Sequence, residues 1–484
     1  MPSLPPPWLP LDRASGNLEE QVYRHMRDRI LSGKIATGQR LPSTRVLATS
    51  LGIARSTVVS AYERLKSEGY LNTTTGSASR VAPLSMSAFA KRDAAPRSIR
   101  PAPNVAAEQR SLEPGVPDLT DFPHKAWARC LGARARWPRV HDLGYGEACG
   151  IRELREEIIE HLSTTRGVVA RPEQVLIVPS TRVAIDLLAS LRLTVGGKDV
   201  AWMEEPGYST AKVILAKTGA SIIPVPCDDA GMDVSGAVGL PPPRTIYTTP
   251  SHQYPTGTTM SLQRRLALLD VARSSGALVL EDDYDSDFQY GSRPIAALQG
   301  IDRHEVVAYL GTFSKILAPG LRVAYAVVPS WLIDEAQAAL QLRGAVVSTH
   351  IQAALADFIR EGRLRAYLRQ MNEKYAERMA ATVSALRHHC GHLLDVTEGS
   401  GGLQLASWFH NRTADDAAAA DALRQDGIAP QPMSRFYLGA PRPGLLFGIA
   451  NASTKDIDAL AARIARILTK CGGGSAPTGT LPHQ

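Results

Sequence analysis

The sequence contains few cysteines, and none of them lies in a metal-binding or disulfide-forming pattern. The five are Cys130, Cys149, Cys227, Cys390 and Cys471. An odd number of scattered thiols without C-x-x-C spacing argues against both a zinc site and a disulfide framework. We therefore expect reduced, mostly buried thiols and no metal site.

Long apolar runs are also missing. No stretch approaches the roughly 18 consecutive apolar residues of a membrane span, and residues 1–10 lack the basic-then-apolar layout of a signal peptide. These absences predict a cytoplasmic protein with no membrane partner. The chain of 484 residues is too long for one ordinary core and long enough for two or three domains.

Positive charge is unevenly placed along the chain. Residues 1–110 carry 16 Lys and Arg against 8 Asp and Glu, which leaves 38 against 39 for the remaining residues of a chain with net charge +7. A localised positive excess is typical of a protein that binds a polyanion, although a basic solvated face gives the same count. Charge alone therefore favours DNA only weakly.

The first eighty residues show the pattern of three short helices and a hairpin. Apolar residues four apart predict a helix over residues 18–32, and Ser43 is placed to cap a second helix. A third helix over about residues 56–68 is expected to turn Val59, Tyr62 and Leu65 inward. Residues 69–71 and 79–81 then predict two strands around a turn.

This arrangement can enter the major groove of DNA. The third helix begins with basic and hydroxyl side chains at Arg55, Ser56 and Thr57, which suit base edges and phosphate oxygens. A three-helix module that binds another protein fits the helical pattern equally well. The pattern alone leaves both alternatives open.

A resemblance favours DNA. The residues that carry it are Gln21-Val22-Tyr23, Gly38-Gln39-Arg40-Leu41-Pro42-Ser43-Thr44-Arg45, Leu47-Ala48, Leu51-Gly52, Arg55-Ser56-Thr57-Val58 and Glu68-Gly69-Tyr70-Leu71. They resemble the GntR-type winged helix-turn-helix throughout its length. The resemblance implies a double-stranded DNA operator as partner, with Arg45, Arg55, Thr57 and the wing residue Gly76 as contacts and with Ser43 and Ser56 as helpers.

Beyond residue 112, short apolar runs alternate with helical stretches. The runs are residues 175–178, 201–203, 222–225, 245–247, 277–280, 306–310 and 323–328. This rhythm predicts a parallel sheet wrapped by helices, in which ligands bind beyond the carboxyl ends of the strands. From about residue 331 the pattern changes to a smaller α+β part.

Lys315 follows one of these runs in the sequence Gly311-Thr312-Phe313-Ser314-Lys315. A lone lysine is usually a surface charge. Here an amine able to form an imine stands beside hydroxyl groups and Arg322, which could hold a phosphate, and an acidic cluster ends the preceding strand. These are the groups that a pyridoxal phosphate site needs.

The same region resembles the fold-type I aminotransferases over about residues 112–470, and within them the MocR-type regulators, which join this domain to a GntR-type head. The segments that carry the resemblance are Tyr145-Gly146-Glu147, Leu154-Arg155, Glu205-Pro206-Gly207-Tyr208, Ser251-His252-Gln253-Tyr254-Pro255-Thr256-Gly257, Glu281-Asp282-Asp283-Tyr284-Asp285-Ser286-Asp287-Phe288 and the lysine motif.

The resemblance implies pyridoxal 5'-phosphate (PLP) as cofactor and a role for each matching residue. Lys315 would form the Schiff base, and Asp282 would accept the pyridinium N–H. Arg322 would bind the phosphate as a bidentate fork. The other implied contacts are Tyr284 to the ring oxygen, Tyr208 stacked on the ring, Thr181, Thr312 and Ser314 to the phosphate, Tyr145 from a neighbouring subunit, and His252 as a neighbour.

The implied architecture has two folded parts. A mostly α winged helix-turn-helix is joined by a linker to an α/β PLP-dependent transferase fold with a small C-terminal α+β subdomain. The expected bounds are 15–82 for the DNA-binding domain, 83–111 for a Pro/Ala/Arg-rich linker, 112–470 for the cofactor domain (large subdomain about 140–330, small subdomain about 331–470) and 471–484 for a flexible tail.

The sequence departs from the aminotransferase pattern at several positions. The Gly expected near Ser180 is missing, and Arg182 is an unusual neighbour for a phosphate loop. Leu446 stands where an Arg commonly holds the substrate carboxylate, so an ordinary amino acid as substrate or effector is in doubt unless Arg442 or Lys212 takes over. Tyr254 stands where many aminotransferases have an Asn.

Three functions remain in competition. The first is a homodimeric transcription regulator that senses an amine or PLP itself, with control of vitamin B6 or amine metabolism as a consequence. The second is a working aminotransferase that carries a DNA-binding head. The third is a DNA-binding protein whose cofactor domain serves only for dimerisation. The missing carboxylate anchor favours sensing, with PLP itself as the signal and control of vitamin B6 synthesis as one consequence, although residual transamination is compatible with it.

Overall fold

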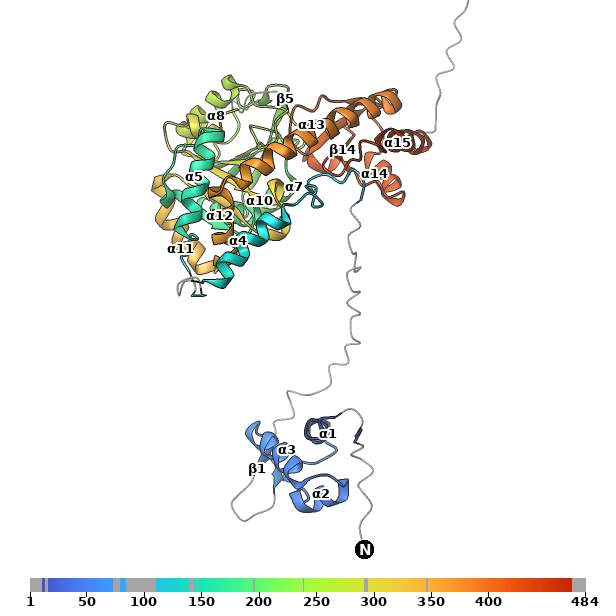
Figure 1. Cartoon of the computed structure of the whole chain (residues 1–484). Helices are drawn as coiled ribbons and strands as arrows, with labels where there is room; N and C mark the ends of the chain where they lie inside the picture. The colour runs from blue at the N-terminus through green and yellow to red at the C-terminus, as the bar shows by residue number, and fades with distance from the viewer. Residues whose placement is uncertain are drawn as a thin grey trace, which may run out of the picture. The chain divides into compact units, whose positions relative to one another are not determined.

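The computed structural model describes residues 11–13, 16–72, 79–83, 110–138, 143–144, 146–194, 196–237, 239–290, 295–344 and 347–471. The predicted contacts Gly76 and Tyr145, most of the expected linker and nearly all of the expected tail lie outside these residues. The chain divides into two compact units, Met1–Val105 and Ala106–Gln484 (Figure 1). No helix among the described residues is long and apolar enough to cross a membrane.

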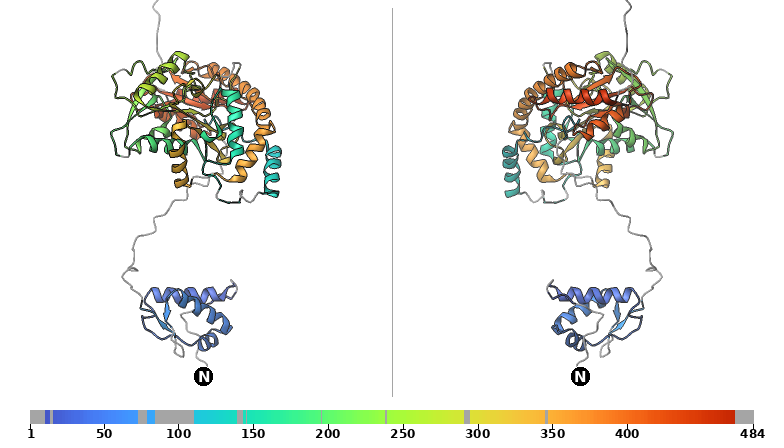
Figure 2. Two further views of the ribbon diagram at one scale, coloured as in Figure 1. Left: turned by 90° about the vertical axis from the view of Figure 1, so that its left-hand side faces the viewer. Right: turned by 90° about the vertical axis from the view of Figure 1, so that its right-hand side faces the viewer.

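The first unit is a three-helix bundle with a small hairpin (Figure 2). Its elements are α1 (Leu18–Leu31), α2 (Thr44–Leu51), α3 (Arg55–Ser67), β1 (Leu71–Asn72) and β2 (Arg80–Val81). The two strands pair antiparallel. Ser43 caps α2 by accepting from the amide of Val46 at 3.3 Å, and Gly52 ends it with a left-handed φ of 62°, so the predicted helix, turn and second helix are present.

The core of this unit corrects one sequence prediction. Val59 is 37% exposed, whereas its neighbour Val58 is fully buried. The helix α3 buries residues at positions 58, 61, 62 and 65, which is the 3-4 spacing of one helical face. Because position 59 lies about 100° further round the helix than position 58, it faces outward.

The second unit is built on an eight-stranded sheet whose strand order is β3-β10-β9-β8-β7-β4-β5-β6. The strands are β3 (Val175–Val178), β4 (Val200–Glu205), β5 (Ser221–Asp228), β6 (Gly231–Met232), β7 (Thr245–Thr248), β8 (Leu278–Asp283), β9 (Val307–Thr312) and β10 (Ala324–Val327). Pairings from β5 through β4, β7 and β8 to β9 are parallel, as predicted. Two strands depart from the predicted parallel sheet: β10 runs antiparallel between β3 and β9, and β6 pairs antiparallel with β5.

Helices surround this sheet, which explains why strands such as β8 and β9 are buried along their whole length and do not alternate. These helices are α4 (His124–Arg136), α5 (Arg152–Arg166), α6 (Thr181–Arg192), α7 (Ser209–Ala216), α8 (Leu262–Ser275), α9 (Leu298–Ile301), α10 (Phe313–Ile316), α11 (Ile333–Arg343) and α12 (Thr349–Arg360).

The rest of the second unit is a smaller α+β part that begins with α13 (Arg363–Cys390), whereas the sequence predicted a start at about residue 331. Its other elements are β11 (Leu394–Val396), β12 (Gln404–Phe409), α14 (Asp416–Gln425), β13 (Gln431–Pro432), the 3₁₀ turn η6 (Met433–Phe436), β14 (Gly444–Gly448) and α15 (Ile457–Cys471). The four strands form an antiparallel sheet in the order β11-β12-β14-β13. The long helix α13 runs from the large part to the small one, where α15 packs along it (Figure 1).

The exposed and buried valines of α3 provide a matched test of the first unit. Val58→Ala removes two buried methyl groups and leaves a cavity, which is expected to cost about 2 kcal/mol of local stability. Hydrogen exchange of α3 amides in the full-length protein should then be roughly 30-fold faster. Val59→Ala should leave exchange nearly unchanged, and equal effects of the two substitutions would contradict this core.

Candidate functional site

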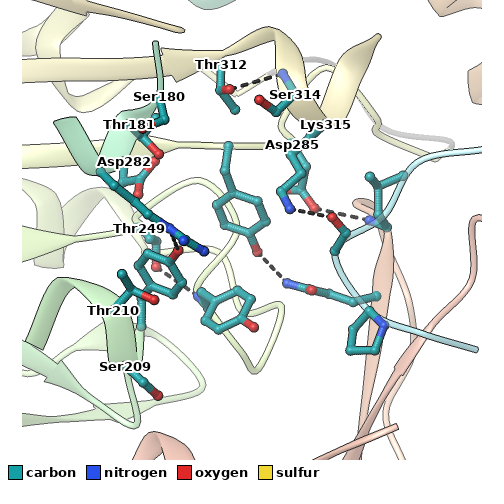
Figure 3. A pocket seen from close by; sticks show the side chains of 18 of the residues that line it. Ser180, Thr181, Ser209, Thr210, Thr249, Asp282, Asp285, Thr312, Ser314 and Lys315 are labelled. Atoms are coloured by element: carbon teal, nitrogen blue, oxygen red, sulfur yellow. Dashed lines mark hydrogen bonds between the residues drawn. The ribbon is translucent and has the colours of Figure 1, made fainter. Parts of the chain in front are cut away.

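A pocket of about 390 Å³ opens at the carboxyl ends of the central strands. Eight of the residues predicted from the sequence line it: Thr181, Tyr208, Asp282, Tyr284, Thr312, Ser314, Lys315 and Arg322. Figure 3 shows Lys315 on one wall and Asp282 on another. The topology therefore brings together groups that come from the ends of β3, β4, β8 and β9, as expected for this kind of sheet.

Three consecutive acids end strand β8, and their surroundings differ. Glu281 accepts from two backbone amides, Leu298 at 2.7 Å and Gln299 at 2.9 Å. Asp283 pairs with the buried guanidinium of Arg166 at 2.8 Å and also accepts a tyrosine hydroxyl. Asp282 alone has an oxygen to spare, because Oδ2 accepts from Tyr247 at 2.6 Å but Oδ1 has no partner among the described residues.

The carboxyl group of Asp282 is buried and lines the pocket. Burial raises its pKa to about 7, although the hydrogen bond from Tyr247 opposes this change. A buried acceptor without a donor costs free energy until something supplies one. The site is therefore prepared to accept a hydrogen bond from a group inside the pocket.

Lys315 lies in the short helix α10 and extends into the same pocket. Its Nζ donates a hydrogen bond to the backbone carbonyl of Gly115. Burial lowers the pKa of this amine, while the charges of Asp285 and Asp282 act in the opposite direction. A lowered pKa increases the neutral, nucleophilic fraction of a lysine.

A third part of the pocket is suited to an oxyanion. Thr181 is the first residue of α6, whose cap is the hydroxyl of Ser180, so free amides of the helix N-terminus are close by. Thr312 and Ser314 lie on the turn between β9 and Lys315, and the amide of Ser314 donates to the hydroxyl of Thr312 at 3.1 Å. Arg322 has an exposed guanidinium and a left-handed φ of 54°.

The predicted neighbour His252 lies beside Tyr284. The hydroxyl of Tyr284 accepts from the side-chain amide of Gln404 at 2.9 Å and lies 3.1 Å from Nδ1 of His252. His252 is not part of the pocket lining, but it pairs with Asp285 at 2.9 Å, which raises the pKa of the imidazole against the opposing effect of burial. His252 therefore contacts the pocket through Tyr284 and Asp285.

The predicted DNA contacts lie at the starts of α2 and α3. Arg45, Arg55 and Ser56 are exposed and Thr57 is half-buried. Arg55 begins α3 and donates from Nε to the hydroxyl of Thr44 at 3.5 Å, which links the two helix starts. Ser43 serves as the cap of α2. These residues form a basic and hydroxyl-bearing surface at two helix N-termini, where phosphate oxygens bind readily.

Two family patterns match the sequence. The bacterial regulatory proteins of the gntR family match residues 18–81, and the aminotransferases of class I and II match residues 141–464. A probable rhizopine catabolism regulatory protein, MocR, of Rhizobium meliloti is 37% identical over 92% of this chain and 93% of its own. The chain belongs to the MocR-type regulators.

Other relatives agree with this membership. The pyridoxine biosynthesis transcriptional regulator PdxR of Corynebacterium glutamicum is 32% identical over 76% of this chain and 79% of its own. The second unit resembles the kynurenine aminotransferase of Pyrococcus horikoshii, with a TM-score of 0.68, 25% identity and coverage of 74% of this chain and 90% of that one. The predicted MocR-type membership and the predicted fold class are thus confirmed.

Leu446 lies in strand β14 of the small subdomain in this MocR-type chain. Leu446 is fully buried in a small apolar cluster and does not line the pocket. The two substitutes considered from the sequence do not line it either. Arg442 lies over the ring of Trp408, and the Nζ of Lys212 donates to the backbone carbonyl of Phe436. Neither is placed to hold a ligand carboxylate in this pocket.

Several pocket residues were not predicted. They include Tyr247, Asp285, Gln404, Arg435 and the Pro114-Gly115 segment. Tyr247 lies inside an apolar strand and reaches the site only because β7 pairs with β8. The end position of β7 was the one signal available, since parallel neighbours end at the same edge of a sheet.

The raised pKa of Asp282 predicts an unusual pH dependence for the cofactor-free protein. Because the folded-state pKa is about 7, above the ordinary value, the stability from this group is full below about pH 4 and is lost as pH rises through about 7. Asp282→Asn removes this titration, so its stability should fall less between pH 5 and pH 8, by about 3 kcal/mol. Denaturant unfolding at several pH values measures the difference.

Asp287 provides a control, because its pKa is shifted in the opposite direction to that of Asp282. The hydrogen bond to His161 lowers the pKa of Asp287, although burial acts against it. Its contribution is therefore present above the ordinary pKa and lost as pH falls, so Asp287→Asn should destabilise the protein at neutral pH. A cofactor-free Asp282→Asn protein that is less stable than the wild type at pH 8 would contradict the assigned environment of Asp282.

Proposed function

We propose that the protein is a transcription regulator that binds double-stranded DNA through its first unit. Its second unit would hold PLP on Lys315 and sense an amine or PLP itself. The observation that carries this proposal is Oδ1 of Asp282, which has no hydrogen-bond partner among the residues that the structure describes and lies in the same pocket as the amine of Lys315. A protonated pyridine ring supplies the one donor that this carboxylate lacks.

The remaining groups suit the rest of the cofactor. Arg322, Thr181, Thr312 and Ser314 would hold the phosphate, and the ring of Tyr208 would lie against the pyridine face. When bound, the cofactor supplies an electron sink for chemistry at the carbon next to an amine nitrogen. Asp282 would keep the ring nitrogen protonated, and Lys315 would hold or release a proton at Nζ.

The segment that follows the expected linker reaches the pocket directly. Its carbonyl at Gly115 accepts from Lys315, and its backbone is anchored to the small subdomain through Ser111 and Leu112. Ser111 exchanges hydrogen bonds with Gly427 and Ala429 at 3.2 and 2.9 Å, and Leu112 accepts from Gly448 at 2.8 Å. Covalent attachment at Nζ would compete with the bond to Gly115, so loading would favour a different arrangement of this segment.

This proposal makes the response to a ligand a difference in affinity between two arrangements. The chain that leads to the DNA-binding unit continues directly from this segment. We further propose a homodimer, which presents two DNA-binding units to a symmetric operator. An exposed Trp137, at the end of α4, supplies apolar surface for such an assembly.

Catalytic transamination is the second candidate function. The observation that favours it is the amine of Lys315, whose pKa burial lowers, in a domain that resembles solved aminotransferases. It predicts sustained turnover of an amino donor and a keto acid that is lost in Lys315→Ala. Turnover at ordinary enzyme rates would contradict a pure sensor.

Replacing Lys315 tests the cofactor and its role together. Lys315→Ala is expected to abolish covalent PLP absorbance and to make the DNA footprint of the full-length protein independent of added PLP and amines. Lys198→Ala is the control, because Lys198 is exposed and outside the pocket. A wild-type protein that remains colourless with PLP, or whose footprint never changes, would contradict the sensor and leave a dimerisation scaffold.

Replacing Arg55 tests the DNA surface. If the Arg55 side chain contacts a base, Arg55→Ala is expected to weaken operator binding roughly tenfold or more. If it binds a phosphate, the substitution is expected to lower the number of ions released on DNA binding, which is obtained from the salt dependence, by about one. Lys66→Ala, at the other end of the same helix, should change neither quantity by a similar amount. Binding titrations at several salt concentrations measure both, and equal effects of the two variants would refute this surface.

A further inference from the structure

The pocket holds a guanidinium that the sequence motifs did not indicate. Arg435 lies in the turn η6 of the small subdomain and lines the same pocket as Lys315. It is exposed, and its Nη1 donates to Oε1 of Gln431 at 3.3 Å. Within the described parts of the chain, no Asp or Glu lies within ion-pair distance of it. An Arg without a counter-ion, facing a pocket, is suited to a ligand oxyanion.

The turn that carries Arg435 packs on an apolar cluster of the small subdomain. Met433 and Phe436 on either side of it are buried against Leu446. Phe436 also lines the pocket, and the guanidinium of Arg435 lies 5.6 Å from the centroid of its ring. Leu446 therefore acts as part of the apolar support of the turn.

The backbone of the same turn is fixed from two sides by hydrogen bonds. Asp416 accepts from the amide and the hydroxyl of Ser434 at 2.9 and 2.6 Å. The carbonyl of Arg435 accepts from the hydroxyl of Ser209 at 3.0 Å. The carbonyl of Phe436 accepts from the amide of Gly207 at 3.0 Å.

Lys212 completes this support from the large subdomain. Its Nζ donates to the carbonyl of Phe436 and lies 3.5 Å from a carboxylate oxygen of Glu205. Glu205 in turn accepts from the amide of Gly439 at 2.7 Å. Lys212 is therefore engaged in positioning the turn, and this is why it is not available to a ligand.

We propose that Arg435 is the residue that selects the ligand of this pocket, by binding an oxyanion carried by the amine. The ligand class is thus an amine with a carboxylate or a similar anionic group, with its nitrogen at Lys315 and its oxyanion at Arg435. The planar guanidinium provides two parallel donors for such a group. This inference rests on the proposed function, because it takes Lys315 as the group that meets the amine.

Arg182 is a poorer choice for this role. It follows Thr181 at the start of α6, where the proposal places the phosphate, and its Nε donates to the hydroxyl of Tyr208 at 3.3 Å. Arg322 is assigned to the same phosphate. Arg435 is the pocket arginine that comes from the small subdomain, away from both.

Matched amines test the proposal. The PLP-loaded full-length protein is titrated with ω-amino carboxylates of increasing chain length and with the corresponding alkylamines, and binding is followed by cofactor absorbance and by the DNA footprint. We expect at least one amino carboxylate to bind roughly 10- to 100-fold more tightly than its alkylamine, as for a charged hydrogen bond. Arg435→Gln should remove this preference, and Arg435→Lys should keep part of it.

Arg442→Gln is the matched control, because Arg442 belongs to the same subdomain but does not line the pocket; it should leave the preference intact. Equal binding of both amines in every pair, no binding of either, or an unchanged preference in Arg435→Gln would overturn the role of Arg435. A wild-type protein that takes up no PLP would instead overturn the proposed function itself, and the role of Arg435 with it.

Discussion

Asp282 is a carboxylate removed from water, and only one of its oxygens has a partner among the described residues. The acids on either side, Glu281 and Asp283, are satisfied by amides, a guanidinium and a hydroxyl. An unsatisfied buried acceptor costs on the order of 1–3 kcal/mol, so the surrounding fold has to maintain it. The parallel sheet does so by fixing β7 and β8 side by side, with Tyr247 held against Asp282.

The other groups of the pocket depend on the same edge of the sheet. Lys315 follows β9 and Thr181 follows β3, so both arrive where β8 delivers Asp282. The strand β10 separates β3 from β9 in the sheet. The site therefore spans several strands. The carboxylate of Asp282 and the amine of Lys315 lie at different positions in it, which leaves room for an elongated ligand.

The sequence predicted the parts of this arrangement that are encoded locally. Lys315, Asp282, Tyr284 and Arg322 stand in motifs whose chemistry can be read directly, and the strand ends were close to those observed. The antiparallel direction of β10 and the contribution of Arg435 depend on how distant segments meet. Neither periodicity nor spacing carries that information, and Val59 was misplaced because a choice between adjacent helix positions depends on packing against other helices.

At Leu446 the sequence lacks the arginine that commonly binds the substrate carboxylate, but the pocket contains an arginine at a different position. A leucine in β14 cannot bind a carboxylate, but it packs beneath the turn that presents Arg435. The hydrogen bonds from Ser209, Gly207 and Lys212 come from the segment that also carries Tyr208. A ligand held between Lys315 and Arg435 would thus connect the large and small subdomains. The segment at Ser111 and Leu112 is bonded to the small subdomain as well, so a shift of that subdomain would be passed to the chain that leads to the DNA-binding unit.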